Sequence, residues 1–323
     1  MHISILLPEG NISVSNLEAT YKMFTMANDA LTQSDNVPKF VVQLVAVNRE
    51  KKSSNNIFDI KADITIQNLK KTDLIIIPAV HGPYENVVDS NKNLVPWLVD
   101  QYRKGAEIAS LCIGAFILAS SGLLDGRGCT THWMAAEEFK SMFPLVNLQD
   151  DKIITDENGI YTSGGAYSSL NLNLYLIEKF IGREMAVRQS KIFEIDIDRH
   201  SQSPFIIFNT QKNHDDELMQ KVQLYIEHNY SENITVSELC AKFSIGRRTF
   251  ERRFSKAINN TVIEYLQRVR VEAAKKMFEK NYLNISEVMY SVGYTDATAF
   301  RKVFLKIVGL TPSAYQKRYA RIN

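Results

Sequence analysis

The stretch ISEVMYSVGYTDATAFRKVF, residues 285–304, decides the fold of the C-terminal part of the chain. Apolar residues in Ile285–Val292 recur at i, i+3, i+4 and i+7, which is the spacing of one buried helix face. Gly293 interrupts this pattern at a turn that needs positive φ, and a second helix is predicted with Phe300 and Phe304 on its inner side. Two short helices joined by a tight turn are typical of a helix-turn-helix unit.

The same arrangement occurs once more upstream. Thr235 can cap a helix whose apolar residues repeat the spacing as far as Phe243. A short break, SIG at residues 244–246, leads to a second helix with Phe250 and Phe254 one turn apart. The sequence therefore predicts two helix-turn-helix units in one all-α domain.

The segment Thr261–Glu279 is predicted to form one long helix between the two units. At about 1.5 Å per residue, its 19 residues span roughly 28 Å. A rigid spacer of that length can hold two second helices close to one turn of DNA apart, about 34 Å, so that one chain contacts two successive segments of the major groove. The second helix of the downstream unit is expected to be capped by Thr295 or Asp296.

Polar side chains on the outer faces of the two second helices are the candidate DNA contacts. Arginine can bind guanine through two hydrogen bonds, Thr298 can touch a thymine methyl group, and Glu251 can accept a hydrogen bond from cytosine. Arg247, Arg253 and Lys256 are expected to contact phosphates, which set salt dependence rather than sequence preference. Alternatively, these cations are only solvated surface groups. The candidates are Arg247, Arg248, Glu251, Arg252, Arg253, Lys256, Thr295, Thr298, Arg301 and Lys302.

These motifs resemble the AraC/XylS family of transcription regulators, over about residues 219–319. The matching motifs are SIGRRTFERRF (244–254), RVRVEAA (268–274), GYTD (293–296), FRKVF (300–304) and GLTPSAY (309–315). One departure is Asn259-Asn260, which stand where a glycine is usual after the second helix of the first unit; asparagine tolerates the left-handed conformation. The resemblance implies a sequence-specific DNA-binding regulator, with double-stranded DNA as its partner and RNA polymerase as a further candidate partner.

Composition and charge fit a globular protein of two domains. The chain has 323 residues, more than one compact core of ordinary size holds, with 45% hydrophobic and 23% charged residues. The net charge of +2 divides unevenly: from Lys212 onward there are 19 Lys/Arg and 12 Asp/Glu, a net +7, against −5 before that point. This division indicates that the C-terminal part alone meets a polyanion, although basic surfaces also serve solubility.

The N-terminus and the cysteines favour a cytoplasmic location. Residues 1–8 lack the basic start of a signal peptide and are predicted to form a buried strand. No apolar run reaches the roughly 18 residues that a membrane span needs, so no membrane partner is expected. The three cysteines are too few and too scattered for a disulfide framework or a zinc site. A reducing compartment is therefore expected, with no metal and no cofactor.

Residues 1–205 are expected to form an α/β domain, followed by a linker at 206–216 and the helical domain at 217–323. Short β-branched runs alternate with longer amphipathic stretches, a pattern typical of a largely parallel sheet. A hairpin is predicted at Thr155–Thr162, where Asn158-Gly159 supplies the turn. The predicted strands are Ile3–Leu7, Phe40–Val47, Leu74–Pro78 and Ile108–Cys112, and the predicted helices are Asn16–Leu31, Leu94–Lys104, Ile113–Ser121 and Leu170–Ile181.

The segment IASLCIGAF, residues 108–116, passes from strand to helix with Cys112 at the junction. Helix N-terminal N–H groups around such a turn lower a thiol pKa, so Cys112 is predicted to favour the thiolate. This segment and the later His132 resemble the DJ-1/PfpI superfamily, in particular the regulators that join such a domain to an AraC-type reader (the GlxA-like group). The resemblance covers about residues 3–190 and implies a flavodoxin-like sandwich, with Cys112 and His132 as its elbow cysteine and neighbouring histidine.

Three roles are open for this domain, besides inert scaffolding. As a sensor, it would bind a small ligand at the C-terminal ends of the strands, near Cys112, His132, His81 and Gly164. The chain is then expected to dimerise through this domain. As an enzyme, it would use Cys112 and His132 with a third group in hydrolysis or glyoxalase-like chemistry. As a redox sensor, it would signal by oxidation of Cys112. A fused DNA reader favours the sensor, because ligand binding can bias DNA affinity.

Overall fold

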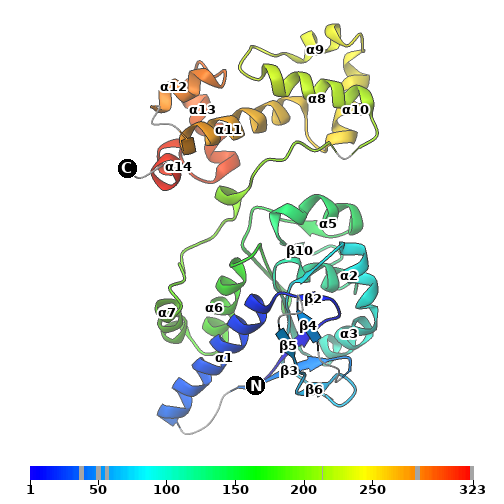
Figure 1. Ribbon diagram of the computed structural model, residues 1–323, viewed down its shortest axis with the longest axis vertical. Coiled ribbons are helices and arrows are strands. Elements are labelled where there is room, and N and C mark those ends of the chain that lie inside the picture. The colour runs from blue at the N-terminus through cyan, green and yellow to red at the C-terminus, as the bar shows by residue number, and fades with distance from the viewer. Residues whose placement is uncertain (36–39, 49–51, 55–57, 213, 281–283, 321–323) are drawn as a thin grey trace. The chain divides into compact units, whose positions relative to one another are not determined.

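The N-terminal and C-terminal parts of the chain form separate compact units, Met1–Gln202 and Ser203–Asn323 (Figure 1). Among the described residues, no helix is both long enough and apolar enough to cross a membrane. The computed structural model describes residues 1–35, 40–48, 52–54, 58–212, 214–280 and 284–320.

A seven-stranded sheet forms the centre of the N-terminal unit. Neighbouring strands are parallel except for the edge pair β12–β13, so the predicted mostly parallel sheet is confirmed. All four residues of β7 are fully buried, as expected for a strand covered on both faces. In spatial order the strands are β12 (Ile154–Glu157), β13 (Ile160–Ser163), β9 (Glu107–Ser110), β7 (Leu74–Ile77), β1 (His2–Leu7), β3 (Val41–Ala46) and β6 (Ile64–Thr65).

Helices cover the two faces of this sheet (Figure 1). Helix α6 packs against α1 and α7, and α2 packs against α4. The helices are α1 (Val14–Asp35), α2 (Tyr84–Ser90), α3 (Val95–Arg103), α4 (Ala115–Ala119), α5 (Ala136–Met142), α6 (Ser168–Phe180) and α7 (Arg183–Ile192). Three short strand pairs complete the unit: β2 (Asn11–Ile12) with β8 (Val80–His81), β4 (Lys52–Ser54) with β5 (Phe58–Ile60), and β10 (Gly128–Cys129) with β11 (Asn147–Leu148).

Two local features of this unit bear on the predictions. Asn158 and Gly159 have φ of +53° and +75°, and they join the antiparallel pair β12–β13, so the predicted hairpin is confirmed. The helix predicted at Ile113–Ser121 is shorter, because it opens with a 3-10 turn at Cys112–Gly114 and α4 ends at Ala119. Beyond that end, the hydroxyls of two serines bond the carbonyls of the last turn, which competes with further helix.

The described part of the C-terminal unit is helical. The helix predicted at Thr261–Glu279 is present as α11. A short 3-10 turn, Ser203–Phe205, precedes the first α-helix of the unit. The helices are α8 (Glu217–Asn229), α9 (Val236–Lys242), α10 (Arg247–Ile258), α11 (Val262–Lys280), α12 (Ile285–Ser291), α13 (Ala297–Val308) and α14 (Pro312–Tyr319).

Two apolar cores lie along α11. The first core takes buried residues from the N-terminal half of α11, within Val262–Val269, together with Phe254 of α10. The second takes residues from the C-terminal half, within Val271–Phe278, together with Phe304 of α13. One helix therefore belongs to both cores, and this rigid connection fixes the two helix-turn-helix units along a common axis.

Residues 203–212 and 214–216, which we call the strap, pack on the C-terminal unit. The carbonyl of Pro204 accepts a hydrogen bond from the hydroxyl of Tyr319 in α14 at 3.4 Å. Phe208 packs against the first core, and the carbonyl of Gln211 accepts from the side chain of Gln223 in α8 at 3.0 Å. The strap thus contacts elements of both helix-turn-helix units.

Candidate functional site

Both helix-turn-helix units begin with a capping box. In the first, the Thr235 hydroxyl accepts from the Glu238 backbone N–H at 3.2 Å, and the Glu238 carboxylate accepts from the Thr235 N–H at 2.8 Å. In the second, Asn284 and Glu287 make the same two bonds at 2.9 and 2.8 Å. Each box satisfies N–H groups that a helix start leaves free. The cap predicted at Thr235 is confirmed; sequence analysis missed the one at Asn284, although its Asn-x-x-Glu spacing is a visible signal.

The turn inside the second unit is one residue longer than the turn inside the first. In the first unit, Ser244 has φ of +50° and Gly246 is the N-cap of α10. In the second, Gly293 has φ of +82°, which confirms the predicted turn glycine, and Asp296 is the N-cap of α13. The carboxylate of Asp296 accepts a backbone N–H at 2.6 Å, so Asp296 rather than Thr295 caps this helix.

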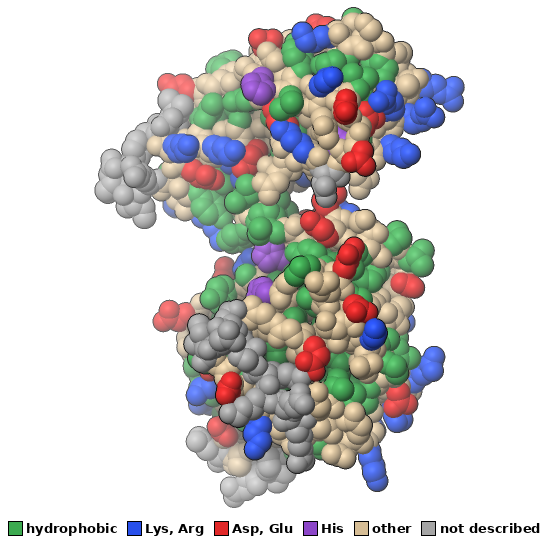
Figure 2. All heavy atoms as spheres, turned by 45° about the vertical axis from the view of Figure 1, so that its right-hand side comes forward, with side chains coloured by type: hydrophobic (Ala, Val, Ile, Leu, Met, Phe, Trp, Pro, Cys, Tyr) green, Lys and Arg blue, Asp and Glu red, His purple; other side chains and the backbone are tan. Residues whose placement is uncertain are grey.

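Helices α10 and α13 have the same pattern of buried and exposed positions. Phe250 and Phe254 of α10, like Phe300 and Phe304 of α13, are at most 1% exposed, which assigns these aromatic residues to the cores. Lys and Arg side chains gather at the end of the C-terminal unit that carries α10 (Figures 1 and 2). The predicted contact residues that lie exposed at the surface are Arg247, Arg248, Glu251, Arg252, Lys256, Thr295, Thr298, Arg301 and Lys302.

Arg253 is placed differently from the other predicted contacts. Its half-buried side chain donates to both carboxylate oxygens of Asp216, at 2.9 and 2.7 Å. Asp216 also caps α8, because its carboxylate accepts from the Met219 N–H at 3.2 Å. Hydrogen bonding by the Arg253 guanidinium holds the pKa of the Asp216 carboxyl below its usual range. A phosphate would have to share this guanidinium with Asp216, so the structure gives Arg253 a role in holding α10 against α8.

Arg270 in α11 connects the first unit to the second. Its guanidinium donates to the carbonyls of Tyr230 and Glu232, at 2.7 and 2.8 Å, in the loop after α8. The same guanidinium lies 5.2 Å from the ring centre of Tyr294, in the turn of the second unit. This turn approaches the loop so closely that a Cβ on Gly293 would lie 2.5 Å from a backbone oxygen of the loop. The sequence around Arg270 gives no signal of this role, since the partners of Arg270 lie far from it in the chain.

Cys112, the first residue of the 3-10 turn that follows β9, occupies a rare backbone conformation. Its φ is +54°, a value that few residues other than glycine adopt, and its side chain is 5% exposed. Burial raises the pKa of the Cys112 thiol, while the backbone N–H groups of Ala166 and Ile113 lower it by less. The prediction of a lowered thiol pKa is therefore wrong: two backbone donors do not replace the water that burial removes.

The loop of residues 163–166 brings the other predicted cleft residues together with Cys112. The Cys112 N–H donates to the hydroxyl of Ser163 at 3.2 Å. Next to Gly164, Gly165 leaves room for the ring of His132. A Cβ on Gly165 would collide with this ring. Burial and the neighbouring His81 lower the pKa of His132. The structure thus places Cys112, His132, His81 and Gly164 in one cluster at the carboxyl end of the sheet.

The arrangement at His132 does not match a Cys–His catalytic pair. Its Nδ1 accepts from the Met134 backbone N–H at 3.1 Å, so this nitrogen is already engaged. Within the described part of the chain, His132 makes no hydrogen bond to Cys112, and no carboxylate orients its ring. A nucleophile and base need both contacts. The described residues also contain no cluster of three His, Cys, Asp or Glu side chains placed for a metal.

Gln202, the last residue of the N-terminal unit, is 1% exposed and contacts both sides of this cluster. Its side-chain nitrogen donates to the carbonyls of Thr131 and Asp150, at 3.0 and 2.7 Å. Its side-chain oxygen accepts from the Gly165 N–H at 3.2 Å, and a Cβ on Gly164 would lie 3.0 Å from the amide. Sequence analysis missed this residue; the only signal was a break in the pattern at residues 201–204.

Comparisons with known proteins agree with both halves of this description. A family model described as "DJ-1/PfpI family" matches residues 13–179, and one described as "Helix-turn-helix domain" matches residues 239–318. The HTH-type transcriptional regulator GbdR of Pseudomonas aeruginosa is 26% identical over 254 residues, which cover 78% of this chain and 68% of the relative. The HTH-type transcriptional regulator GlxA of Rhizobium meliloti is 25% identical over 221 residues, 67% of each chain.

Among solved structures, an AraC family transcriptional regulator from Pseudomonas putida superposes with a TM-score of 0.51. The superposition covers 59% of this chain and 98% of the other, at 18% sequence identity. At that identity the similarity concerns the fold alone.

Proposed function

Because the chain belongs to the DJ-1/PfpI family and carries an AraC-type helix-turn-helix domain, we propose that it is a DNA-binding transcription regulator that responds to a small ligand. The observation that carries the proposal is the duplication of the DNA-binding element. The two recognition helices, α10 and α13, have the same buried aromatic face and exposed polar outer faces. Relatives that match most of the chain are themselves named transcriptional regulators. A regulator of this kind acts where the chromosome lies, which we take to be the cytoplasm.

Double-stranded DNA is the partner that fits the C-terminal unit. The 19 residues of α11 rise about 28 Å, a length close to one DNA turn of about 34 Å. Exposed Arg248 and Arg252 on α10, and Arg301 and Lys302 on α13, supply positive charge for the phosphates and donors for base edges. We propose that both helices occupy major-groove segments of one duplex. Dimerisation through the N-terminal unit and contact with RNA polymerase are further parts of the proposal that rest on the family resemblance.

The ligand site that we propose is the cluster around Cys112 and His132. Gln202 supports this assignment because its amide is bonded to the loops that surround the cluster and is followed directly in the chain by the strap. A ligand that shifts the 163–166 loop would break or strain the bond from the Gly165 N–H to Gln202. The strap follows Gln202 in the chain and contacts both helix-turn-helix units. Ligand binding that displaces Gln202 can therefore alter DNA affinity by moving the strap.

We assign Cys112 to ligand contact rather than to catalysis. Burial raises the pKa of its thiol, which reduces the thiolate needed by a nucleophile or by an oxidation switch. The Nδ1 of His132 accepts from the Met134 N–H, and no hydrogen bond joins His132 to Cys112 among the described residues, so the geometry offers no base in contact with the thiol. The raised thiol pKa of Cys112 also counts against the redox sensor.

The test is DNA binding by the full chain. Sites are first enriched from a random duplex library, and affinity for an enriched and a random duplex is then measured by fluorescence anisotropy at several salt concentrations. A reader that neutralises 6–10 phosphates loses roughly 10³-fold or more in affinity between about 50 and 200 mM salt. The variant Lys104→Gln, an exposed position of the N-terminal unit, serves as a control and should bind as the unchanged chain does. Binding that is absent, or that does not respond to salt, would overturn the proposal.

A further inference from the structure

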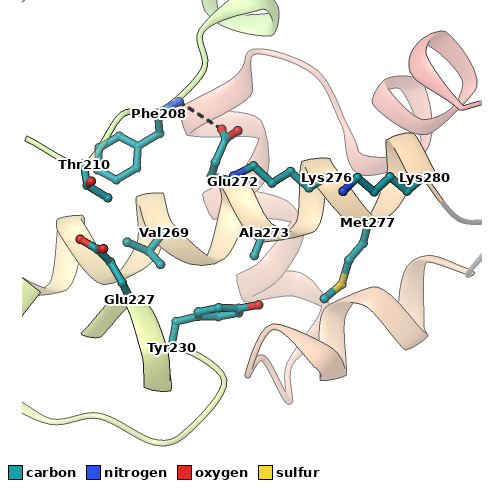
Figure 3. A pocket seen from close by; sticks show the side chains of 10 residues that line it. All are labelled: Phe208, Thr210, Glu227, Tyr230, Val269, Glu272, Ala273, Lys276, Met277 and Lys280. Atoms are coloured by element: carbon teal, nitrogen blue, oxygen red, sulfur yellow. Dashed lines mark hydrogen bonds between the residues drawn. The ribbon is translucent and has the colours of Figure 1, made fainter. Parts of the chain in front are cut away.

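A cavity of 420 Å³ lies in the C-terminal unit between the strap, α8 and α11 (Figure 3). Val269, Ala273 and Met277 form its floor, since they follow one another at intervals of four residues along one face of α11. The rings of Phe208, from the strap, and Tyr230, after α8, lie on opposite sides of this floor (Figure 3). The volume falls in the range of small-molecule sites, which are mostly apolar with a few polar groups.

The two carboxylates at the wall of this cavity are already engaged. Glu272 accepts from Lys275 at 2.8 Å and from the Phe208 N–H at 3.2 Å (dashed in Figure 3). Glu227 accepts from Lys212 at 2.7 Å and from the Tyr265 hydroxyl, also at 2.7 Å. Both negative charges are therefore compensated by protein groups, and they leave no demand for a cationic ligand.

Two positive charges of the same cavity are not compensated. Lys276 and Lys280 line it from α11, four residues apart and therefore on one side of the helix, and both are exposed. Among the described residues, neither ammonium group has a carboxylate partner. An apolar floor beside two unpaired ammonium groups is complementary to a molecule with an apolar body and one anionic end.

The geometry points to a second ligand site here: the cavity binds a small amphipathic carboxylate, with its hydrocarbon or aryl body on Ala273 and Met277 and its carboxylate at Lys276 and Lys280. Each ammonium donates a charge-assisted hydrogen bond to the carboxylate, which is stronger than a bond between neutral groups. The bound molecule contacts the strap, through Phe208, and the helix shared by both cores. It therefore fastens the strap to α11, and occupancy of this site opposes any displacement of the strap that starts at Gln202.

The experiment measures binding of decanoate to the full chain by calorimetry in the absence of DNA, with decanol, which has the same chain length and no charge, as the comparison ligand. Lys276→Gln/Lys280→Gln should weaken decanoate binding by roughly tenfold or more, the loss expected for hydrogen bonds to charged groups, and should leave decanol unchanged. Ala273→Leu, which fills the half-buried floor, should weaken both ligands. Lys317→Gln, an exposed lysine on α14, is the control and should change neither.

A second readout locates the ligand. In protein labelled with ¹³C at its methionine methyl groups, decanoate should shift the resonance that is missing from Met277→Leu. This shift should disappear in Lys276→Gln/Lys280→Gln, whose exposed positions allow the chain to fold as before. Undiminished decanoate binding by the lysine variant, an equal loss for decanol, or no saturable binding of decanoate would overturn the site. Because no DNA is present, each of these outcomes leaves the proposed regulator function untouched.

Discussion

The two helix-turn-helix units share one apolar design and differ in their polar positions. The rings of Phe254 and Tyr265 in the first unit lie 5.6 Å apart at 80°, and those of Phe304 and Tyr315 in the second lie 5.7 Å apart at 76°. Both tyrosine hydroxyls donate to a glutamate: Tyr265 to Glu227 of α8, and Tyr315 to Glu279 of α11. The two ring spacings thus agree within a few tenths of an ångström, because close packing holds α10 on α11 in the first unit and α13 on α14 in the second.

The outer faces of the recognition helices have diverged. Five Lys or Arg residues lie on α10, against three on α13. Position 251 carries glutamate in the first unit, and the corresponding position 301 carries arginine in the second. The first unit also has the Arg253–Asp216 pair, whereas Val303 stands at the position of Arg253 in the second. Packing therefore constrains the inner faces of both units, whereas the side chains on the outer faces are free to differ between them.

The largest expected effect comes from removing one of the duplicated aromatic rings. Phe304→Ala should destabilise the C-terminal unit by about 3–5 kcal/mol, because the ring is fully buried and its removal leaves a cavity. Phe254→Ala, at the matching position, should cost about the same. The measurement is urea unfolding followed by circular dichroism at the helical band. A loss in one variant without a comparable loss in the other would show that the two cores are not equivalent.

A smaller effect distinguishes the turns of the two units. Gly293→Ala should destabilise the second unit by about 2–3 kcal/mol, because φ is +82° and the new Cβ would lie 2.5 Å from a backbone oxygen. At the matching Ser244, where a side chain already accepts φ of +50°, the variant Ser244→Gly should stay within about 1 kcal/mol of the unchanged chain. Thermal unfolding measures both. Equal unfolding temperatures for the two variants would mean that the turn of the second unit is not held against the loop after α8.

The apolar periodicity of the sequence was sufficient to predict these duplicated elements. The spacing around Phe250 and Phe300 identifies an inner face whatever surrounds it, since a helix needs only local sequence to set its periodicity. The pKa of Cys112 was predicted in the wrong direction, because it depends on how much water the whole fold removes from the thiol. The hydrogen bonds of Gln202 and Arg270 could not be predicted, since their partners come from segments far away along the chain.

Because positions 251 and 301 carry different residues, substitutions at these two positions should change DNA binding in different ways. Arg301→Ala should weaken binding to an enriched duplex by about 1–3 kcal/mol if the side chain reads a base. Glu251→Ala should change the preferred base with little loss on random duplex, because it removes an acceptor and frees Arg247, which it now pairs with at 3.0 Å. Anisotropy with enriched and random duplexes measures both. An equal loss on the two duplexes would reassign Arg301 to phosphate contact.

The smallest expected effect concerns the ion pair that the second unit lacks. Asp216→Asn keeps a side chain that can cap α8, because asparagine is as good an N-cap as aspartate, but removes the charge that pairs with Arg253. The loss of stability at neutral pH should be small, since partly exposed ion pairs contribute little. Asp296→Asn, at the N-cap of α13, is the matched control, because this aspartate has no arginine partner among the described residues.

The pH dependence of that loss separates the charge from the cap. Arg253 lowers the pKa of Asp216 in the folded chain, so the ion pair stabilises the fold above the ordinary aspartate pKa of about 3.9 and ceases to do so as the pH falls through the lowered value. The difference in unfolding temperature between the unchanged chain and Asp216→Asn should therefore be present at pH 7 and shrink toward pH 3. A difference that stays constant across this range would mean that Asp216 acts through its capping hydrogen bond alone, and the two units would then be held by the same kinds of contact.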